Sequence, residues 1–456
     1  MKILLIEPTR PYWGITAGWR DKFEPLALEY IAAGVSQDHD VMILDMRLDK
    51  DLQSTLRDFR PDVVGTTSFT LHVNTVKSLL QEIKEWNPQV LTVVGGHHAT
   101  VAPEDFLSPS IDLIVIGEGF FVFKEIIARF EKGNDFDGIP GTAFAREGAL
   151  VRTDYSMDID LDSLPFPDRS LTAKYRKHYF LDWMSPIASM RTSKGCPHRC
   201  NFCVLWKLTG GRYFRRKPEK VVEELAGIDE KYVFFADDES LLDTTRMKTM
   251  ANLIKEAGIK KQYFLWSRSD TIAKNPELIE MWKDIGLSRV FVGFEFGRDE
   301  DLEYIRKGST TSDNEKAARI LQDLGIQIDA SFMVRPDFTR ADFAALRQYC
   351  RHLELEHTNF FILTPFPGTD LYEELQDKLV NHNHDYYDAK HAVLPTQLPL
   401  KEFYDEYHHL HKAAIPRIRN IKHLMRYPLK EIPSILLRRY LNVIRHRSAY
   451  FDHHQE

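Results

Sequence analysis

The chain has 456 residues, of which 43% are hydrophobic and 28% are charged. These ordinary globular values exclude a disordered, collagen-like or coiled-coil chain, and the length predicts two large domains or about three smaller ones. No apolar run reaches the length of about 18 residues that a membrane-spanning helix needs. The N-terminal residues also lack the long apolar region of a signal peptide, so we expect a cytoplasmic protein.

The net charge of -7 argues against a general nucleic-acid-binding protein, so no nucleic-acid partner is expected. The charge is unevenly spread, because residues 412–447 carry ten Lys and Arg against one acid. This basic segment has a charge of +9, which leaves -16 for the rest of the chain. We therefore expect the segment to have a role or a partner of its own.

Residues 1–132 alternate short apolar runs, typical of buried strands, with helical patterns. The strands are expected at 3–7, 41–45, 63–67, 90–95 and 113–117, and the helices at 25–35, 52–59, 73–86 and 121–130. This alternation predicts an α/β domain with a doubly wound, Rossmann-like parallel sheet. Ligands of such sheets bind at the carboxyl ends of the strands.

The rest of the chain is predicted to form three further parts. Residues 133–187 are rich in Gly and Pro and are expected to be a linker with a small hairpin. Residues 188–370 hold six strand-helix units, which predict a partial (β/α)6 barrel with its site at the C-terminal strand ends. Residues 371–456 are expected to be mostly helical and basic.

Three of the four cysteines, Cys196, Cys200 and Cys203, fall within eight residues. Thiolates select zinc or iron-sulfur clusters. Zinc would need a fourth ligand, and Cys350 is far away while His198 lies awkwardly between two of the cysteines. Three cysteines on a cubane cluster leave one iron open to bind and reduce a ligand, so an iron-sulfur cluster is favoured.

The Cys-x3-Cys-x2-Cys spacing, Phe202 just before the third cysteine, and the position after the first barrel strand resemble the radical S-adenosylmethionine (SAM) superfamily. The resemblance implies a [4Fe-4S] cluster on the three cysteines, with SAM chelating the open iron. It also implies one-electron cleavage of SAM to a 5'-deoxyadenosyl radical and an electron donor such as flavodoxin or ferredoxin. Phe202 would then contact the cofactors.

Residues at the later strand ends agree with this resemblance. Asp237 and Asp238 would accept from the SAM ammonium, and Arg268 would hold the methionyl carboxylate bidentately. Glu295 would accept from the ribose hydroxyls, and Pro365 would line the adenine side. The alternative for each residue is an ordinary solvated strand end.

A doubly wound domain before such a barrel resembles the cobalamin-binding class of the superfamily, which implies that residues 1–132 bind cobalamin. The candidate contacts follow three neighbouring strands: Thr67, Ser68 and Thr70, then Gly95, Gly96 and His97, then Gly117 and Glu118. Small residues there would let the backbone approach a large ligand. Phe120 departs from the class, which often carries a second acid at that position.

The lower face of the cobalt is expected to lack a histidine. No Asp-x-His-x-x-Gly motif is present, and residues 8–14 contain no histidine, so cobalamin would bind in the base-off form. His97 and His98 are interpreted as tail contacts or surface groups rather than axial ligands. A nucleotide pocket is disfavoured because no Gly-x-Gly-x-x-Gly follows the first strand.

Within this class, residues 201–213 and 218–224 most resemble the hopanoid-modifying methylases of the C-3 type. That resemblance implies methylation of an unactivated carbon, in a hopanoid, another lipid or a small molecule. The alternatives are a cobalamin-dependent cyclase or ring-forming enzyme acting on a tetrapyrrole or another natural product, and a non-catalytic iron-sulfur electron carrier. A carrier would have no need of Asp237, Arg268 and Glu295 around the cluster.

The basic segment at residues 412–447 suits an amphipathic helix with a cationic face. Such a helix either packs on the barrel or makes a peripheral contact with the inner face of the membrane.

Overall fold

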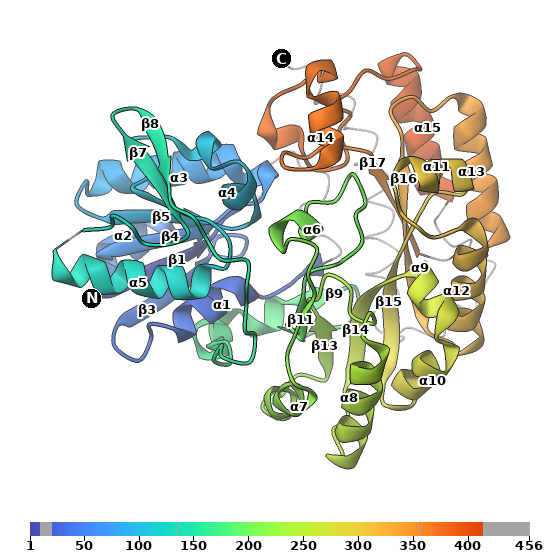
Figure 1. Cartoon of the computed structure of the whole chain (residues 1–456), viewed down its shortest axis with the longest axis horizontal. Coiled ribbons are helices and arrows are strands. Elements are labelled where there is room, and N and C mark those ends of the chain that lie inside the picture. The colour runs from blue at the N-terminus through green and yellow to red at the C-terminus, as the bar shows by residue number, and fades with distance from the viewer. Residues whose placement is uncertain (10–20, 134, 356, 414–456) are drawn as a thin grey trace.

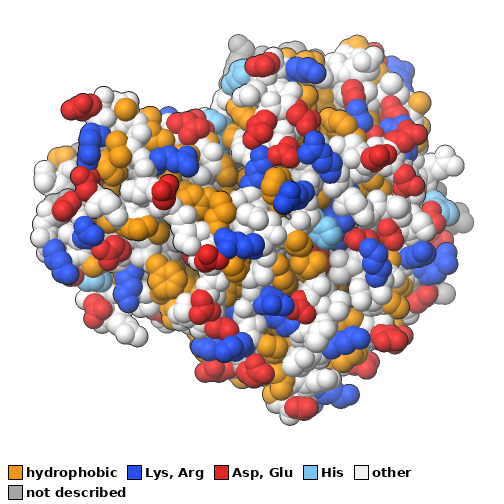
Figure 2. All heavy atoms as spheres, in the orientation of Figure 1, with side chains coloured by type: hydrophobic (Ala, Val, Ile, Leu, Met, Phe, Trp, Pro, Cys, Tyr) orange, Lys and Arg blue, Asp and Glu red, His pale blue; other side chains and the backbone are white. Residues whose placement is uncertain are grey.

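The computed structural model describes residues 1–9, 21–133, 135–355 and 357–413. The described chain forms two lobes, each built around one sheet (Figure 1). Figure 2 shows acidic and basic side chains interspersed over one face of both lobes.

The N-terminal lobe holds a seven-stranded sheet in the order β3-β1-β4-β5-β6-β7-β8. Its strands are β1 (Lys2–Glu7), β3 (Asp40–Asp45), β4 (Val63–Thr67), β5 (Leu91–Gly95), β6 (Leu113–Val115), β7 (Thr142–Arg146) and β8 (Ala149–Arg152). The first five strands in this order are parallel, and the order reverses between β1 and β4. Ligands of such sheets bind beside this reversal, at the carboxyl ends of the strands.

Helices cover both faces of this sheet, as the doubly wound prediction requires. On one face lie α1 (Leu26–Ala33) and α5 (Gly119–Lys132), and on the other lie α2 (Leu52–Phe59), α3 (Val73–Trp86) and α4 (His97–Val101). The sequence of α2 shows why it forms, because the Asp51 side chain caps its first turn and Leu52, Leu56 and Phe59 lie buried on one stripe.

The hairpin β7–β8 pairs antiparallel with β6, so this sheet continues past residue 132 into the segment expected to be a linker. The rest of that segment contains the 3-10 helix η3 (Arg169–His178) and β9 (Phe180–Leu181), which pairs with β2 (Asp21–Lys22). The sequence predicts the hairpin from its turn residues, but it carries no signal for the strand with which the hairpin pairs.

The second lobe is a six-stranded parallel sheet in the order β10-β13-β14-β15-β16-β17. The strands are β10 (Ile187–Met190), β13 (Tyr232–Phe235), β14 (Gln262–Arg268), β15 (Leu287–Glu295), β16 (Gln327–Val334) and β17 (His357–Ile362). Across the described residues β10 and β17 do not pair, so the barrel is partial and stays open, as predicted.

The outer face of this sheet packs against helices and forms the largest core (Figure 1). These helices are α7 (Pro218–Ala226), α8 (Thr244–Glu256), α10 (Pro276–Asp284), α12 (Thr311–Asp323) and α13 (Arg340–His352). The lower part of the inner face is filled by the segment that joins the lobes, through Tyr175, Tyr179 and Met184.

The region after the barrel contains α14 (Asp370–Leu375), the short 3-10 helices η4 (Gln376–Lys378) and η5 (His384–Tyr386), and α15 (Leu400–Ala413). Helix α15 packs on α13 and β17, while η5 reaches back to the N-terminal lobe and contacts α3 and η1 (Thr70–His72). The basic segment lies outside the described residues except at its start. Over the described parts of the chain, no helix combines the length and apolar character needed to cross a membrane.

Candidate functional site

The cysteine loop follows β10 and the short strand β11 (Ser193–Lys194). Gly195 enters the loop with a φ of +94°, and a Cβ there would lie 2.2 Å from the carbonyl oxygen of Arg212, so only glycine fits. Inside the loop, the backbone nitrogen of Cys203 and the indole of Trp206 both donate to the carbonyl of Cys200, at 3.2 and 3.1 Å. Hydrogen bonds within the loop, and those that join Asn201 to Ile305 and Leu371, therefore hold it in place.

The three cysteine sulfurs lie close enough to influence one another, but they are not clustered as zinc ligands are. Burial, with the charges of Glu239 and Cys200 adding to it, raises the pKa of Cys196 to about 11. Burial, with the other two cysteines adding to it, raises the pKa of Cys203 to about 12. The sulfurs do not all lie within 4.8 Å of one another. Tetrahedral zinc with Zn–S bonds of about 2.3 Å would bring its sulfurs to about 3.8 Å, so the three sulfurs are not arranged here as ligands of one zinc ion.

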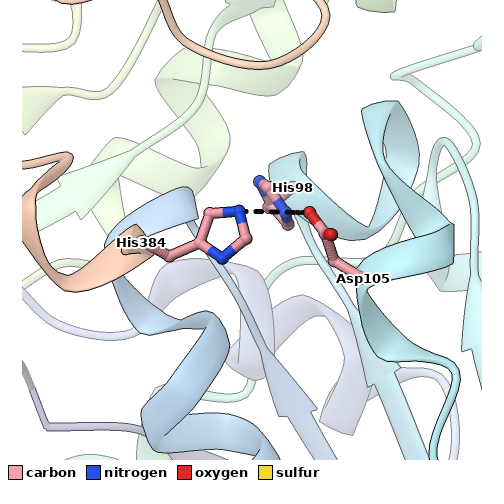
Figure 3. Close-up of side chains that lie close together, drawn as sticks. All are labelled: His98, Asp105 and His384. Carbon is pink, nitrogen blue, oxygen red and sulfur yellow. Dashed lines mark hydrogen bonds and ion pairs between the residues drawn. The ribbon is translucent and has the colours of Figure 1, made fainter. Parts of the chain in front are cut away.

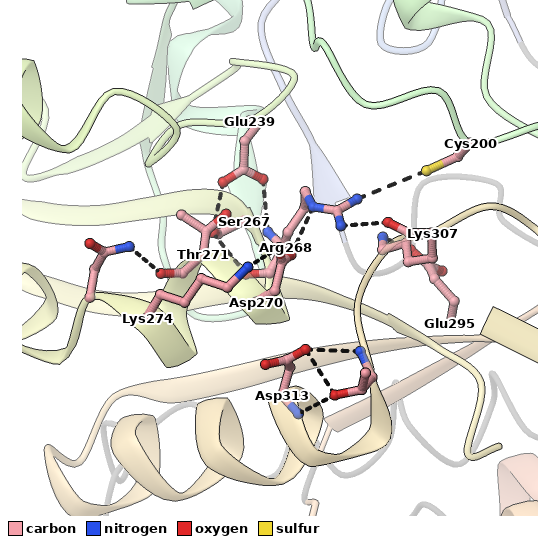
Figure 4. Close-up of polar contacts among 12 residues, drawn as sticks. Cys200, Glu239, Ser267, Arg268, Asp270, Thr271, Lys274, Glu295, Lys307 and Asp313 are labelled. Atoms are coloured by element: carbon pink, nitrogen blue, oxygen red, sulfur yellow. Dashed lines mark hydrogen bonds and ion pairs between the residues drawn. The ribbon is translucent and has the colours of Figure 1, made fainter. Parts of the chain in front are cut away.

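Two buried cations lie beside Cys200 (Figure 4). The Arg268 guanidinium donates to the Cys200 Sγ at 3.9 Å and to the Lys307 carbonyl at 2.5 Å. Burial lowers the pKa of Lys307, but the charges of Glu295 and Cys200 outweigh this effect and raise it. Positive charge at this point suits a cluster whose thiolate ligands carry negative charge, so the residues present fit an iron-sulfur cluster.

Arg268 and Glu295 are already engaged within the protein. Arg268 also donates from Nε to Asp270 at 2.8 Å, and the Lys307 ammonium donates to Glu295 at 2.6 Å. Glu295 ends β15 with a φ of +62°, which is strained for a residue with a side chain. A Cβ on Gly293 would lie 2.5 Å from the Glu295 carboxylate, so this glycine makes room for the ion pair.

The carboxylates of Asp237 and Asp238 hold the backbone that approaches the cysteine loop. Asp237 accepts from the Thr192 backbone nitrogen at 2.6 Å and hydroxyl at 2.6 Å, and from the Ser193 nitrogen at 2.8 Å. Asp238 accepts from the Gly195 nitrogen at 2.6 Å. Burial raises the pKa of both carboxyls. The two acids therefore fix the backbone that leads into Cys196.

Glu239 is a neighbouring acid that the sequence analysis did not select. It is 2% exposed and accepts from the Ser267 hydroxyl at 2.9 Å and the Arg268 nitrogen at 2.7 Å. Burial raises its pKa to about 7, and its charge reaches Cys196. The sequence could have indicated Glu239, because it directly follows Asp237 and Asp238. Lys307 lies in no motif, so the sequence gives no reason to select it.

Phe202 lies in the cysteine loop, and Pro365 lies in the loop that follows β17. Phe202 packs against the barrel core, and Pro365 is buried in the loop that follows β17. That loop continues to Gly368, where a Cβ would lie 2.7 Å from the Cβ of Val101 on α4. The last barrel loop is therefore pressed against the N-terminal lobe.

Two of the glycines at the strand ends of the N-terminal lobe lie against other parts of the chain. Gly96 has a φ of +101°, and a Cβ there would lie 2.5 Å from the Thr67 Oγ1 and 2.8 Å from the Ser68 nitrogen. A Cβ on Gly117 would lie 2.7 Å from the ring of Tyr155. At both positions another part of the chain approaches the backbone too closely for a side chain.

The loops after β4 and β5 are bonded to each other. The Ser68 nitrogen donates to the Gly95 carbonyl at 2.9 Å, and the Thr70 hydroxyl lies 3.1 Å from the Nδ1 of His98. The Thr70 side chain is therefore used within the protein. His97, which precedes His98, packs its ring against Phe69 with centroids 5.0 Å apart.

The carboxyl ends of the N-terminal sheet face the cysteine loop across the seam between the lobes. Glu118, just after β6, accepts from Arg191 at 3.2 Å and from Lys194 at 2.9 Å. Burial raises the pKa of Glu118, but the two cations outweigh it and bring the pKa to about 2. Burial and Lys194 together lower the pKa of His97 to about 4, so its imidazole is neutral at neutral pH.

The sequence of each lobe matches a known family. Residues 13–127 match the B12 binding domain family, and residues 190–350 match the Radical SAM superfamily. Because the first region contains the strand ends that face the cysteine loop, the two matches place a cobalamin-binding lobe against a SAM-binding barrel.

Individual relatives give the same result. The chain is 32% identical to the hopanoid C-3 methylase of Methylococcus capsulatus, over 84% of this chain and 75% of that one. It is 29% identical to the anaerobic magnesium-protoporphyrin IX monomethyl ester cyclase of Rubrivivax gelatinosus, over 83% and 71%. Its fold matches the radical SAM methyltransferase TsrM of Kitasatospora setae, solved with cobalamin and a [4Fe-4S] cluster, with a TM-score of 0.68, 21% identity, and 82% and 78% coverage. The chain belongs to the cobalamin-binding family of radical SAM enzymes.

Proposed function

We propose that this protein is a cobalamin-dependent radical SAM methyltransferase that methylates an unactivated carbon of a large apolar molecule, of the hopanoid or a related lipid class. The observation that carries the proposal is the seam, where Glu118 at the end of β6 bonds to Arg191 and Lys194 just before the cysteine loop. This contact would bring a methyl-carrying cofactor in the first lobe close to a radical-forming cluster in the second. The similarity to a hopanoid C-3 methylase supports the substrate class.

When bound, the cluster and SAM supply a carbon radical by one-electron reduction, and cobalamin supplies the methyl group. Cys196, Cys200 and Cys203 would hold the cluster, with Arg268 and Lys307 offsetting its negative charge. The Glu239 carboxylate, buried near Cys196, would accept from the SAM ammonium.

The remaining predicted residues would line the two cofactor sites. Asp237 and Asp238 would act through the loop backbone that they hold. Phe202, Glu295 and Pro365 would line the SAM site. The strand-end residues of the N-terminal lobe would surround cobalamin without a histidine below the cobalt: Thr67, Ser68, Thr70, Gly95, Gly96, His97, Gly117 and Glu118.

The inner face of the barrel supports an apolar substrate. Trp266 lies in the central strand β14 and is 38% exposed, with its ring 5.5 Å from that of Phe234 and 5.4 Å from that of Phe291. Side chains two residues apart on a strand share a face, so Trp266 lies one layer below Arg268. An exposed aromatic surface at this depth suits a flat, polycyclic hydrocarbon better than a polar metabolite.

An anaerobic assay with SAM, cobalamin, a reductant and a hopanoid tests the proposal. We expect a product heavier by one methylene, together with 5'-deoxyadenosine. Trp266→Ala should raise the KM for the hopanoid by about tenfold, equivalent to about 1.4 kcal/mol of lost contact, without abolishing SAM cleavage. Trp86→Ala on α3 of the other lobe is the matched control. Absence of methylated product, or an unchanged KM in Trp266→Ala, would contradict the proposal.

A second candidate is ring formation on a tetrapyrrole, favoured by the similarity to the cyclase of Rubrivivax gelatinosus. A tetrapyrrole is also flat and polycyclic, so Trp266 does not discriminate between the two. The mass of the product discriminates between methylation and cyclisation, because cyclisation adds no methylene. An electron carrier without catalysis would cleave no SAM in either assay.

A lipid substrate would be reached most easily from a membrane surface, and the +9 charge of residues 412–447 supports such a contact. Deleting the residues after Pro428 should reduce sedimentation with anionic vesicles, and added salt should do the same. If the segment packs on the barrel instead, vesicle binding will be absent from the start and the deletion will lower the melting temperature.

A further inference from the structure

Two histidines and one aspartate meet where the region after the barrel touches the N-terminal lobe (Figure 3). The Nε2 of His98 lies 2.8 Å from the Oδ2 of Asp105, and the Nε2 of His384 lies 3.2 Å from the same oxygen. The three ligand atoms all lie within 4.8 Å of one another, which no other such trio in the described parts of the chain achieves.

The three side chains come from three separate segments. His98 lies on α4, Asp105 on the 3-10 helix η2 (Pro103–Phe106), and His384 begins η5. The neighbouring Asn74 of α3 also donates to Asn383, at 2.9 Å. The contact therefore joins the region after the barrel to the loop that carries Gly95 and Gly96.

His98 is prepared as a ligand. Its side chain is fully buried, and its Nδ1 lies 3.1 Å from the Thr70 hydroxyl, which fixes the ring and leaves Nε2 directed at Asp105. A partner on the second ring nitrogen is the usual way in which a metal-binding histidine is oriented.

The trio is also open on one side. The side chains of Asp105 and His384 are 31% and 22% exposed, so an ion could enter and keep a water molecule.

The distances suit a metal ion. Tetrahedral ligands about 2.0–2.1 Å from zinc lie about 3.3 Å apart, close to the 2.8 and 3.2 Å observed here. Two imidazoles and one carboxylate with an open position form a donor set that binds divalent first-row transition metals. We propose that His98, Asp105 and His384 bind a divalent transition-metal ion that fastens the region after the barrel to the N-terminal lobe.

The competing explanation is a metal-free bridge in which each imidazole donates an N–H to Asp105. Both explanations predict that losing His384 loosens the contact. They differ in whether the wild-type protein binds a metal ion at this place, so metal content is the decisive measurement. The proposal does not depend on the chemistry of the barrel.

The test uses full-length protein that carries no histidine tag and is loaded with its iron-sulfur cluster, so that the cysteine thiols are occupied. After incubation with Zn²⁺ and gel filtration, we expect one zinc per chain by elemental analysis. Zinc-edge X-ray absorption should show nitrogen and oxygen neighbours without sulfur. Zn²⁺ should also raise the melting temperature.

His384→Ala should weaken zinc binding by at least about a hundredfold, since it removes one of three protein ligands. His382→Ala is the matched control, because His382 is exposed and lies two residues away. Asp105→Asn, which keeps the shape but removes the charge, should also lose the zinc. Wild-type protein that retains no zinc and gains no thermal stability from it would overturn the proposal, as would equal zinc retention in His384→Ala.

Discussion

At the residue scale, the cysteines differ in what surrounds them. Cys200 lies beside the buried Arg268 and Lys307, whereas Cys350 lies on the barrel helix α13, where burial raises its pKa to about 12. A cation near a thiolate lowers the free energy of the charged form, and an apolar environment raises it. Cys200 therefore differs from Cys350 in the two cations that lie beside it.

Substitution of these two cysteines should have opposite outcomes. Cys200→Ala leaves the cluster with two protein ligands, so iron content should fall well below about four per chain and 5'-deoxyadenosine formation should be lost. Cys350→Ala should keep both. Anaerobic reconstitution, iron analysis and chromatography of the nucleoside products measure the outcome. Full SAM cleavage by Cys200→Ala would rule out the assignment.

Glu29 on α1 gives a prediction about pH. It is fully buried, the Thr172 hydroxyl donates to one of its oxygens, and its other oxygen has no hydrogen-bond partner in the described structure. Burial, with the nearby Glu24 adding to it, raises its pKa to about 8. The carboxyl is therefore protonated in the folded protein at neutral pH, while in the unfolded chain it ionises near its ordinary pKa.

The folded state holds this proton more tightly, so Glu29 should lower the stability as the pH rises from about 4.5 to about 8. The loss is at most about 1.4 kcal/mol per pH unit in this window. Glu29→Gln carries no such proton, so the variant should match the wild type near pH 5 and be more stable near pH 8. Melting curves of both proteins across this range measure the difference. A difference independent of pH would show that Glu29 is ionised when folded.

Single residues of the candidate site were predictable only where they stood in a motif. The three cysteines could be selected from spacing alone. Lys307, which pairs with Glu295, has no such spacing and is found only once the fold brings residues twelve positions apart into contact. Arg268 could be selected, but not its partner Asp270, because a sequence does not show that both ends of a guanidinium are already engaged.

At the element scale, the geometry of the cysteine loop depends on its first residue. Gly195 has a left-handed φ, and its missing side chain lets the Arg212 carbonyl approach. Gly211 also has a left-handed φ, of +71°, but a Cβ there would meet nothing within 4 Å. A side chain at either glycine would therefore strain the backbone, but only at Gly195 would it also collide with a neighbouring atom.

Gly195→Ala should displace the loop and reduce iron loading severalfold, whereas Gly211→Ala should cost only the backbone strain of about 1 kcal/mol and keep its iron. Iron content per chain and melting temperature, measured on both variants, separate the two effects. Equal iron content in the two variants would show that the contact with Arg212 is not needed to place the cysteines.

Long elements were predictable and short ones were not. The predicted bounds of the helices at 52–59 and 73–86 equal those of α2 and α3, because their apolar residues recur with the period of a helix. The helices α4 and α9 (Ser269–Lys274) have five and six residues, too few to show a period, and were not predicted. Both directly follow strands that carry candidate site residues.

At the scale of the whole molecule, the sequence indicates two lobes but not how they face each other. The seam is built from pairs that are distant in the chain, such as Glu118 with Lys194 and Gly368 against Val101. The sequence around either residue of such a pair does not indicate which residue it contacts. The orientation of the lobes is therefore known only from the structure. It puts the carboxyl ends of the cobalamin-binding lobe next to the cysteine loop.

The seam is tested by Glu118→Gln, which keeps the shape of the side chain and removes its charge. Arg191 and Lys194 would then lie at the seam without their anion, and breaking a buried ion pair from one side costs about 3–5 kcal/mol. Each lobe keeps its own core, so we expect normal iron content and continued formation of 5'-deoxyadenosine, and both proteins are compared at the same cobalamin content. Methylated product should fall at least about tenfold, because the two cofactor sites are no longer held together.

Glu125→Gln on the exposed side of α5 is the matched control. It breaks the surface ion pair with Arg129, which contributes about 0.5 kcal/mol to the stability. The ratio of methylated product to 5'-deoxyadenosine, measured in one reaction, isolates the coupling between the lobes from the loading of either site. A Glu118→Gln protein that forms both products at the wild-type ratio would show that the charge at the seam does not hold the lobes in register. The orientation would then have to rest on apolar contacts such as Gly368 against Val101, which Gly368→Ala would disturb directly.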